Sequence, residues 1–446
     1  MQTGVKIRCC ILLLPAALLV AANAVRASAQ SVNTAQVAPQ NKTLTLSQAE
    51  DLAVRNHPRI ASSDLRAQAA AKVVTEFRAA YFPTLSGSLT GTVADEGTII
   101  AAGALQTSSL SSRTAGGLVL TQLVTDFGRT LNLTRSARLL AEGQKQTAED
   151  TRAQVLLGVR QAYYEVLAAE SVQNAARAAL ENRRLTLRQV NALAQSQMKS
   201  TLDVNFAEVL TSEAELAVYQ AESNVQESKA QLAASLGDEH NLDFTLVEEP
   251  LPSPLESNVE NLVDLALHSR PDLQALQLTE SAAHQFAEAE KKLNYPTVNL
   301  LGAAGEIPQH DSTLRQDQYG AAGVNISIPV FNGKLYSARH GEAEFRAQAA
   351  DKDVEALKVR IARDLRVAWF EANNAFRRLD VTARLVEQAN QALRLAQARY
   401  DNGLGSIVEL NEAQLNQTSA EITAAGAKYE YLSRRAVLDY TSGTIH

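Results

Sequence analysis

The chain has 446 residues and a formal net charge of −7 at pH 7, a balance that gives no basic footprint for nucleic acid. Hydrophobic residues make up 46% of the sequence, which argues against disorder. Aromatic residues make up only 5%, while alanine, glutamine and glutamate are abundant, a composition less typical of a compact enzyme than of long, closely packed helices.

Residues 1–29 are predicted to be a secretory signal peptide, followed by an N-terminal segment at 30–43. Lys6 and Arg8 precede an apolar run from Cys9 to Ala22, and small-residue cleavage patterns follow it. Both cysteines lie at the start of this run, so the exported chain is expected to have no disulfide and no thiolate metal site. No later run approaches ~18 apolar residues, so any membrane insertion is expected to use β-strands.

A helix is expected over residues 47–81, where Pro83 prevents its continuation. Apolar and hydroxyl side chains then alternate over 84–93, the pattern of a strand with one apolar and one wet face. A second strand is predicted at 117–124. The loop between them, 94–115, is long and mostly polar, as are the outer loops of outer-membrane barrels.

A long helix is predicted from Phe127 to Gln195, where no proline interrupts a helix-forming sequence of roughly 100 Å at 1.5 Å per residue. Within it, apolar and small residues recur at the alternating spacing of 4 and 3 that is typical of a coiled coil. The seam consists of Val155, Val159, Ala162, Val166, Ala169, Gln173, Ala176 and Leu180. Its small side chains predict close helix approach, and a shorter helix follows up to Gly237.

The sequence contains an internal duplication. The sequence RQAYYEVLAA from Arg160 returns as RVAWFEANNA from Arg366, an offset of 206 residues that pairs Gly237 with Gly443. We therefore predict two structural repeats, 44–237 and 259–443, each with the order helix, strand, strand, long helix, helix.

The rest of the chain follows from that repeat. A proline-marked linker is expected at 238–258, and residues 444–446 form the C-terminal end. In the second repeat a first helix is expected at 259–294 and strands at 298–304 and 319–330. A second long helix is expected at 334–400, and its seam is Ile361, Leu365, Ala368, Ala372, Ala375 and Leu379.

Four strands per chain cannot close a membrane barrel, because barrels need at least ~8 strands and an open edge leaves backbone groups unsatisfied in lipid. Three copies would supply twelve strands, whereas two would leave little or no lumen. The predicted fold is therefore mainly α with a β-barrel portion: a homotrimer whose twelve-stranded transmembrane β-barrel is continued by an α-helical coiled-coil tunnel.

Two motifs and the duplication together resemble the TolC-type outer membrane efflux proteins over nearly the whole exported chain. The first motif, VTDFGR at 124–129, returns as VFNGK at 330–334, and the second is RYDNG at 399–403 followed by SIVEL at 406–410. The resemblance implies that the first motif lies at the junction between barrel and helices, which gives Asp126, Gly128, Asn332 and Gly333 as junction residues.

The second motif is expected at a sharp helical turn, since glycine readily takes the left-handed conformation that such a turn requires. The resemblance implies that this turn forms the periplasmic tip, which opens and closes and meets an adaptor protein. The candidate docking residues are Gly403, Leu404 and Gly405, with Gln197, Met198 and Lys199 in the first repeat. The first repeat departs from the glycine pattern, and a plain structural turn is the alternative reading.

Four further residues match the gate of the family. Glu409 and Glu412, three apart on one helix face, match an inward-facing acidic ring that would favour cations; ordinary solvated charges are the alternative. Asp203 and Tyr400 match a hydrogen-bonded pair that helps to hold the tip closed. An arginine that completes this lock in the best-known member is replaced here by Gly405.

The resemblance implies a passive exit duct in the bacterial outer membrane, with a large periplasmic extension, serving tripartite efflux or type I secretion. Expected partners are outer-membrane lipid, a periplasmic adaptor and an inner-membrane pump of the RND or ABC type. No phosphate loop, nucleophile elbow or HExxH motif occurs, so no catalytic residue and no cofactor are predicted. His284 and Glu288 alone make a poor metal pair, so no metal site is predicted.

The main alternative is a periplasmic structural or adaptor protein built from coiled-coil hairpins without its own pore. The two predicted strands per repeat argue against it, because an adaptor would flank one hairpin with compact β domains. An enzyme is a weaker alternative.

Overall fold

The computed structural model describes residues 42–93, 99–102, 105–109, 113–198, 200–238, 244–252, 255, 258–309 and 316–445. The predicted signal peptide at 1–29, most of the segment at 30–43 and the predicted tip residue Lys199 lie outside the described residues. Among the helices that are described, none has the length and apolar content needed to cross a membrane.

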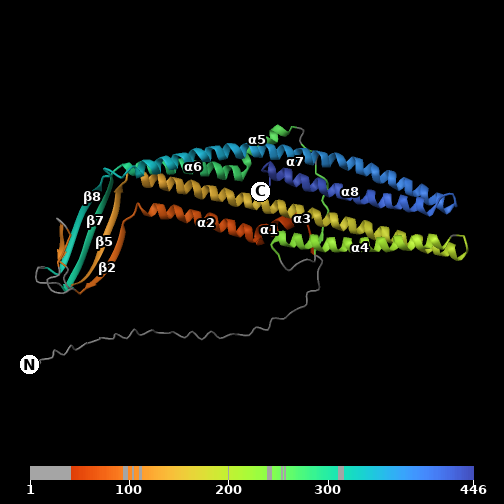
Figure 1. Cartoon of the computed structure of the whole chain (residues 1–446), viewed down its shortest axis with the longest axis horizontal. Helices are drawn as coiled ribbons and strands as arrows, with labels where there is room; N and C mark the ends of the chain where they lie inside the picture. The colour runs from red at the N-terminus through yellow and green to blue at the C-terminus, as the bar shows by residue number, and fades with distance from the viewer. Residues whose placement is uncertain are drawn as a thin grey trace, which may run out of the picture. The chain divides into compact units, whose positions relative to one another are not determined.

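Helices dominate the described chain (Figure 1). They are α1 (Leu46–Asn56), α2 (Pro58–Ala79), α3 (Arg129–Gln195), α4 (Thr201–Leu236), α5 (Val259–Ser269), α6 (Pro271–Lys291), the 3-10 turn η1 (Lys292–Asn294), α7 (Leu335–Asp401) and α8 (Ile407–Thr441). The strands are β1 (Lys42–Leu44), β2 (Thr84–Thr92), β3 (Ile99–Ala102), β4 (Leu105–Ser109), β5 (Arg113–Thr125), β6 (Phe244–Leu246), β7 (Thr297–Gln309) and β8 (Gln318–Ser327).

The first helix of each repeat is broken, which corrects the prediction of one continuous helix at 47–81 and at 259–294. The break falls at His57–Pro58 in the first repeat and at Arg270–Pro271 in the second. His57 and Arg270 have extended backbones, with ψ of 120° and 123°, because a residue that precedes proline is pushed out of the helical region.

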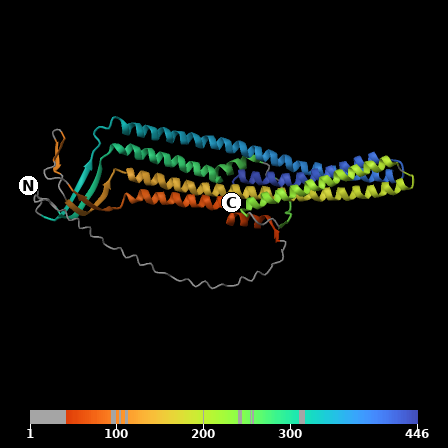
Figure 2. The same cartoon turned by 60° about the horizontal axis from the view of Figure 1, so that its bottom comes forward.

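The two long helices are confirmed, and each has 67 residues. Their predicted seams are largely buried: Val159 and Val166 of α3 and Leu365 and Ala372 of α7 have no exposed surface. The helices α2, α3, α6 and α7 run side by side from the sheet, and α3 and α7 continue into hairpins with α4 and α8 (Figures 1 and 2).

A four-stranded antiparallel sheet, in the order β2-β5-β7-β8, joins the two repeats at the pair β5–β7. The region predicted as a loop at 94–115 contains the hairpin β3–β4 and the start of β5, which corrects the expectation of an irregular segment. A second addition is the short parallel pair β1–β6, which the sequence pattern did not reveal because each strand has only three residues.

The two faces of the large sheet differ in chemistry. The register of the strands brings apolar side chains from all four strands to one face: Leu85, Leu89, Leu118, Leu120, Leu300, Val324 and Ile326. The opposite face carries mostly polar and small ones: Ser86, Ser88, Thr90, Thr121, Asn299 and Asn325, together with Val119 and Leu301. Leu89 is 84% exposed and Val324 63% exposed, so this chain alone leaves the apolar face open.

Two glycines on the polar face make room for an aromatic ring. Gly117, Gly305 and Tyr319 are register partners on three adjacent strands. A Cβ at Gly117 or Gly305 would collide with the Tyr319 hydroxyl and ring. The ring therefore covers backbone that glycine leaves bare, a known way of stabilising glycine within strands.

The largest buried cluster surrounds the middle of α3 and joins α1, β1, β6 and the ends of α4 and α8. At its centre is Tyr163, which is fully buried and packs edge-on against Tyr164. Its hydroxyl lies 2.9 Å from the carbonyl oxygen of Leu44 and 2.7 Å from that of Val247. The matching cluster of the second repeat joins α5, α6, α7 and α8.

The C-terminal ends of α4 and α8 pack closely against the helix breaks before Pro58 and Pro271. Gly237 and Gly443 follow the two helices with left-handed backbones, with φ of +73° and +74°. A Cβ on Gly237 would lie 2.8 Å from the Cα of His57, and one on Gly443 would lie 2.6 Å from Ser269 Oγ. Close to Gly443, Arg270 Nη1 donates to the carbonyl of Thr441, the last residue of α8 (3.1 Å).

We expect Gly443→Ala to destabilise the protein by about 2 kcal/mol or more, since the left-handed backbone alone costs about 1–2 kcal/mol for a residue with a Cβ and Ser269 must also move. Thermal unfolding followed by circular dichroism should show a lower Tm. The control is Gly426→Ala within α8, where a Cβ meets nothing within 4 Å. That change should leave Tm equal or higher because alanine favours helix. Equal Tm values for the two variants would contradict this account of the α8 end.

Candidate functional site

The turns that join α3 to α4 and α7 to α8 lie together at the end of the helices opposite the sheet (Figures 1 and 2). The described residues of the two turns include one left-handed residue at matched positions. Gln197 and Gly403, which are 206 residues apart, have φ of +58° and +72°. In each turn the next N–H bonds back into the helix, from Met198 to Leu193 (2.9 Å) and from Leu404 to Arg399 (2.8 Å). These are helix ends of the Schellman type, and Gln197 achieves one without glycine.

The helices that leave the turns begin with matched serine caps. Ser200 Oγ accepts from the backbone of Asp203 (3.3 Å), and Ser406 Oγ accepts from the backbone of Glu409 (3.1 Å). The Asp203 carboxylate in turn accepts a hydrogen bond from the Ser200 N–H (3.2 Å), which completes a capping box. Glu409 occupies the matched position, yet its side chain turns elsewhere.

Glu409 is held by an ion pair within its own hairpin. Its Oε1 lies 3.2 Å from Arg399 Nε, and both side chains are about half exposed. A Cβ on Gly405 would lie 3.2 Å from Glu409 Oε2 and from Arg399 Cβ, so glycine leaves room for this pair. Glu412, one turn further along α8, is exposed and has no ion-pair partner within the described part of the chain. Of the two predicted ring residues, Glu409 is therefore paired with a cation, whereas within the described residues Glu412 is not.

Tyr400 belongs to a small buried core that joins the two hairpins at the tip. It is 4% exposed and clusters with Val190 of α3 and with Ile407 and Leu410 of α8. Burial, followed by the negative charge of Asp203, raises the pKa of the Tyr400 phenol. The two predicted partners are thus close enough to interact electrostatically, while their direct hydrogen bond stays a prediction.

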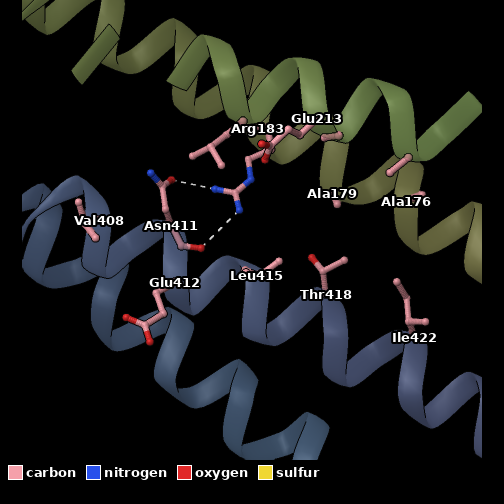
Figure 3. Close-up of a pocket in the computed structure, with 13 residues that line it drawn as sticks. Ala176, Ala179, Arg183, Glu213, Val408, Asn411, Glu412, Leu415, Thr418 and Ile422 are labelled. Carbon is pink, nitrogen blue, oxygen red and sulfur yellow. Dashed lines mark hydrogen bonds between the residues drawn. The ribbon is translucent and has the colours of Figure 1, made fainter. Parts of the chain in front are cut away.

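An apolar groove of about 520 Å³ lies between the two hairpins, where α3, α4 and α8 meet (Figure 3). Its apolar lining includes Leu210, Ala214, Leu415 and Ile422. Figure 3 shows Arg183 projecting from α3 towards α8, whereas the carboxylate of Glu412 points away from it.

Arg183 bridges the hairpins with three hydrogen bonds. It donates to Asn411 Oδ1 (2.8 Å), to the Asn411 carbonyl (3.3 Å) and to Gln414 Oε1 (2.6 Å). Burial lowers the pKa of its guanidinium, an effect that nearby Glu213 opposes. Gln414 is 8% exposed and donates in turn to Thr186 Oγ1 (3.3 Å), so the bridge continues as a polar network between α3 and α8.

Sequence reasoning missed this bridge. The offset of 206 pairs Arg183 with Ala389, and Gln414 with Glu208, so the bridge has no counterpart in the other repeat. The sequence does show that the two repeats differ at these positions. It does not show which helices meet, so the bridge could not be predicted from it.

The junction between sheet and long helices has the same backbone in both repeats. Phe127 and Gly128 are consecutive left-handed residues before α3, as are Gly333 and Lys334 before α7. At the first junction the buried Asp126 carboxylate accepts from the backbone of Gly128 (3.1 Å) and Thr130 (2.6 Å), which satisfies free N–H groups of α3. Asn332 stands at the matched position before α7.

Comparison with known proteins gives a match to the family described as "Outer membrane efflux protein" over residues 49–238 and 262–444, which cover most of each predicted repeat. The chain belongs to this family. The predicted resemblance to TolC-type proteins is thereby confirmed, and family membership gives the outer membrane as the location and efflux as the kind of transport.

The chain is similar to the outer membrane protein TolC of Salmonella enteritidis. It is 22% identical over 423 residues, which cover 90% of this chain and 84% of the relative. The fold is similar to that of the outer-membrane channel OprN, with a TM-score of 0.78, 20% identity and 90% of each chain covered. It is also similar to the Campylobacter jejuni CmeC outer membrane channel, with a TM-score of 0.79, 18% identity, and 90% of this chain and 85% of that one covered.

We expect Arg183→Ala to loosen the contact between the two hairpins, because it removes charged hydrogen bonds worth about 1.5–3 kcal/mol and leaves Gln414 buried without them. Hydrogen exchange should become faster in the α8 amides around Asn411. The control is the neighbouring Arg184→Ala, which removes an exposed pair with Glu215 (3.4 Å) and should change stability by less than about 1 kcal/mol. Equal exchange in both variants would show that the bridge does not hold the hairpins.

Proposed function

We propose that three copies of this chain form a passive exit duct, in which a twelve-stranded membrane barrel is continued by a periplasmic tunnel of helices. The sheet carries this proposal. Among the described strands, β2 and β8 each have a strand neighbour on one side only, and open edges are not tolerated in lipid. Pairing β8 of one copy with β2 of the next would satisfy both edges.

The two faces of the sheet fit the same arrangement. The face with Leu85, Leu89 and Val324 is apolar and exposed, as is required of a surface against lipid hydrocarbon. The face with Ser86, Ser88 and Asn325 would line the aqueous interior, where the Tyr319 ring covers its glycines. The alternation of apolar and polar side chains along each strand therefore fits a barrel with lipid outside and water inside.

At the other end, the tip would meet a periplasmic adaptor that couples the duct to an inner-membrane pump of the RND or ABC type. The described tip presents two large apolar side chains, Leu404 and Met198, at 73% and 71% exposure. Both stand next to the left-handed residues Gly403 and Gln197, so the turn backbone projects them outward. The proposed duct has no catalytic step of its own and serves efflux or type I secretion.

The proposal is tested by purifying the full chain in detergent, measuring its oligomeric mass and recording single-channel conductance in planar bilayers. A trimeric mass with discrete, cation-selective steps is expected. A water-soluble monomer without conductance would overturn the proposal in favour of a periplasmic coiled-coil scaffold.

The same recordings separate the two glutamates of the proposed acidic ring. We expect Glu412→Gln to lower the cation-to-anion permeability ratio, because it removes a carboxylate that no ion pair neutralises among the described residues. The matched control is the double change Arg399→Gln with Glu409→Gln, which removes a neutral pair and should change the ratio less. If Glu412→Gln leaves the ratio unchanged, the ring does not set selectivity.

A further inference from the structure

Three side chains that can bind metal meet between α6 and α7, in the part of the bundle between the sheet and the tip. Glu280 and His284 lie one helical turn apart on α6, and Asp351 lies opposite them on α7. His284 Nε2 is 2.8 Å from Asp351 Oδ1, and one ligand atom from each of the three residues lies within 4.8 Å of the others. The two helices run side by side in Figures 1 and 2.

The cluster differs from the pair that the sequence spacing suggested. Glu288, one turn after His284, pairs with Lys291 at 3.6 Å and does not belong to it. The third donor comes instead from a residue 67 positions later in the chain. Only the packing of α6 on α7 brings it there.

We propose that Glu280, His284 and Asp351 form a binding site for a divalent transition-metal cation of the Zn²⁺ type that links α6 to α7. Zinc accepts imidazole nitrogen and carboxylate oxygen as ligands, and with three protein ligands a water takes the fourth position. Two carboxylates and a neutral imidazole also balance the charge of the ion.

The geometry needs little adjustment. Donor atoms around a tetrahedral zinc ion lie ~3.4 Å apart, given metal–ligand bonds of about 2.0–2.1 Å. The His284–Asp351 contact of 2.8 Å must open slightly, while the other donor atoms already lie within 4.8 Å of one another. Rotation of side chains suffices for this, because Glu280 and Asp351 are half-buried and His284 is exposed.

The cation next to Asp351 in the chain is Lys352. Lys352 itself pairs with Glu355 at 2.9 Å, so it is held along α7 by another acid. In the metal complex the hydrogen of the neutral imidazole stands on Nδ1, which leaves Nε2 as the ligand. Protons therefore compete with the metal, and affinity falls as the pH decreases.

The test is a zinc titration of the untagged, full-length protein in detergent after removal of metal with a chelator. One Zn²⁺ per chain is expected, and His284→Ala should weaken binding by at least about tenfold. The matched control is His268→Ala, an exposed histidine of α5 whose Nδ1 contacts the Asp264 carbonyl (2.7 Å). This change should leave zinc affinity unaltered.

A second measurement guards against variants that merely fold badly. Asp351→His keeps a donor atom at the position and should retain zinc, whereas Asp351→Ala should lose it. Co²⁺ added in place of Zn²⁺ should give the visible absorption of a tetrahedral ion in the native chain and in His268→Ala but not in His284→Ala. The proposal is wrong if the native chain binds no zinc, or if His284→Ala binds it as tightly as His268→Ala. In either case the cluster is an ion pair only.

Discussion

Close contact along the seams of α3 and α7 is the constraint on which the rest of the structure depends. Ala162 and Ala176 on α3 and Ala368, Ala372 and Ala375 on α7 are buried, and small side chains allow neighbouring helices to approach closely. Because these helices run from the sheet end to the tip, each of α1, α2, α4, α5, α6 and α8 packs against at least one of them. The low aromatic content follows from the same constraint, since large rings do not fit such a seam.

The two repeats keep backbone conformation more faithfully than residue identity. Each junction has two consecutive left-handed residues, but glycine stands second in the first repeat, at Gly128, and first in the second, at Gly333. Among the described residues, each tip turn has one left-handed residue, which is Gln197 in one hairpin and Gly403 in the other. Hydrogen bonds of the helix ends and packing of the neighbouring elements therefore hold a conformation that only some of these residues favour on their own.

The repeats differ most where the proposed gate lies. Asp203 and Glu409 occupy matched positions after serine caps, yet one completes a capping box and the other pairs with Arg399. Arg183 bridges to α8, while its counterpart Ala389 has no side chain that could do so. The two hairpins of the tip therefore have similar backbone conformations but different side-chain contacts. Different contacts can hold the proposed tip closed on the side of each hairpin.

The sequence by itself determined the duplication, the two 67-residue helices, the alternating strands and the glycine turns. These features are local, since they depend on hydrophobic period, on proline and on the conformations open to glycine. Pro58 and Pro271 also carry the signal of the two helix breaks, because a residue before proline avoids the helical region.

Only the tertiary structure decided which side chains meet. The Arg183 bridge joins residues 228 and 231 positions apart, and the cluster around His284 joins α6 to α7. The Arg399–Glu409 pair spans a turn whose course the sequence predicted, but not the side-chain contact across it. Such contacts depend on how far each helix is rotated about its axis and on its register against its neighbour. Neither quantity is set by the residues of one helix alone, because both arise from the packing of the whole bundle.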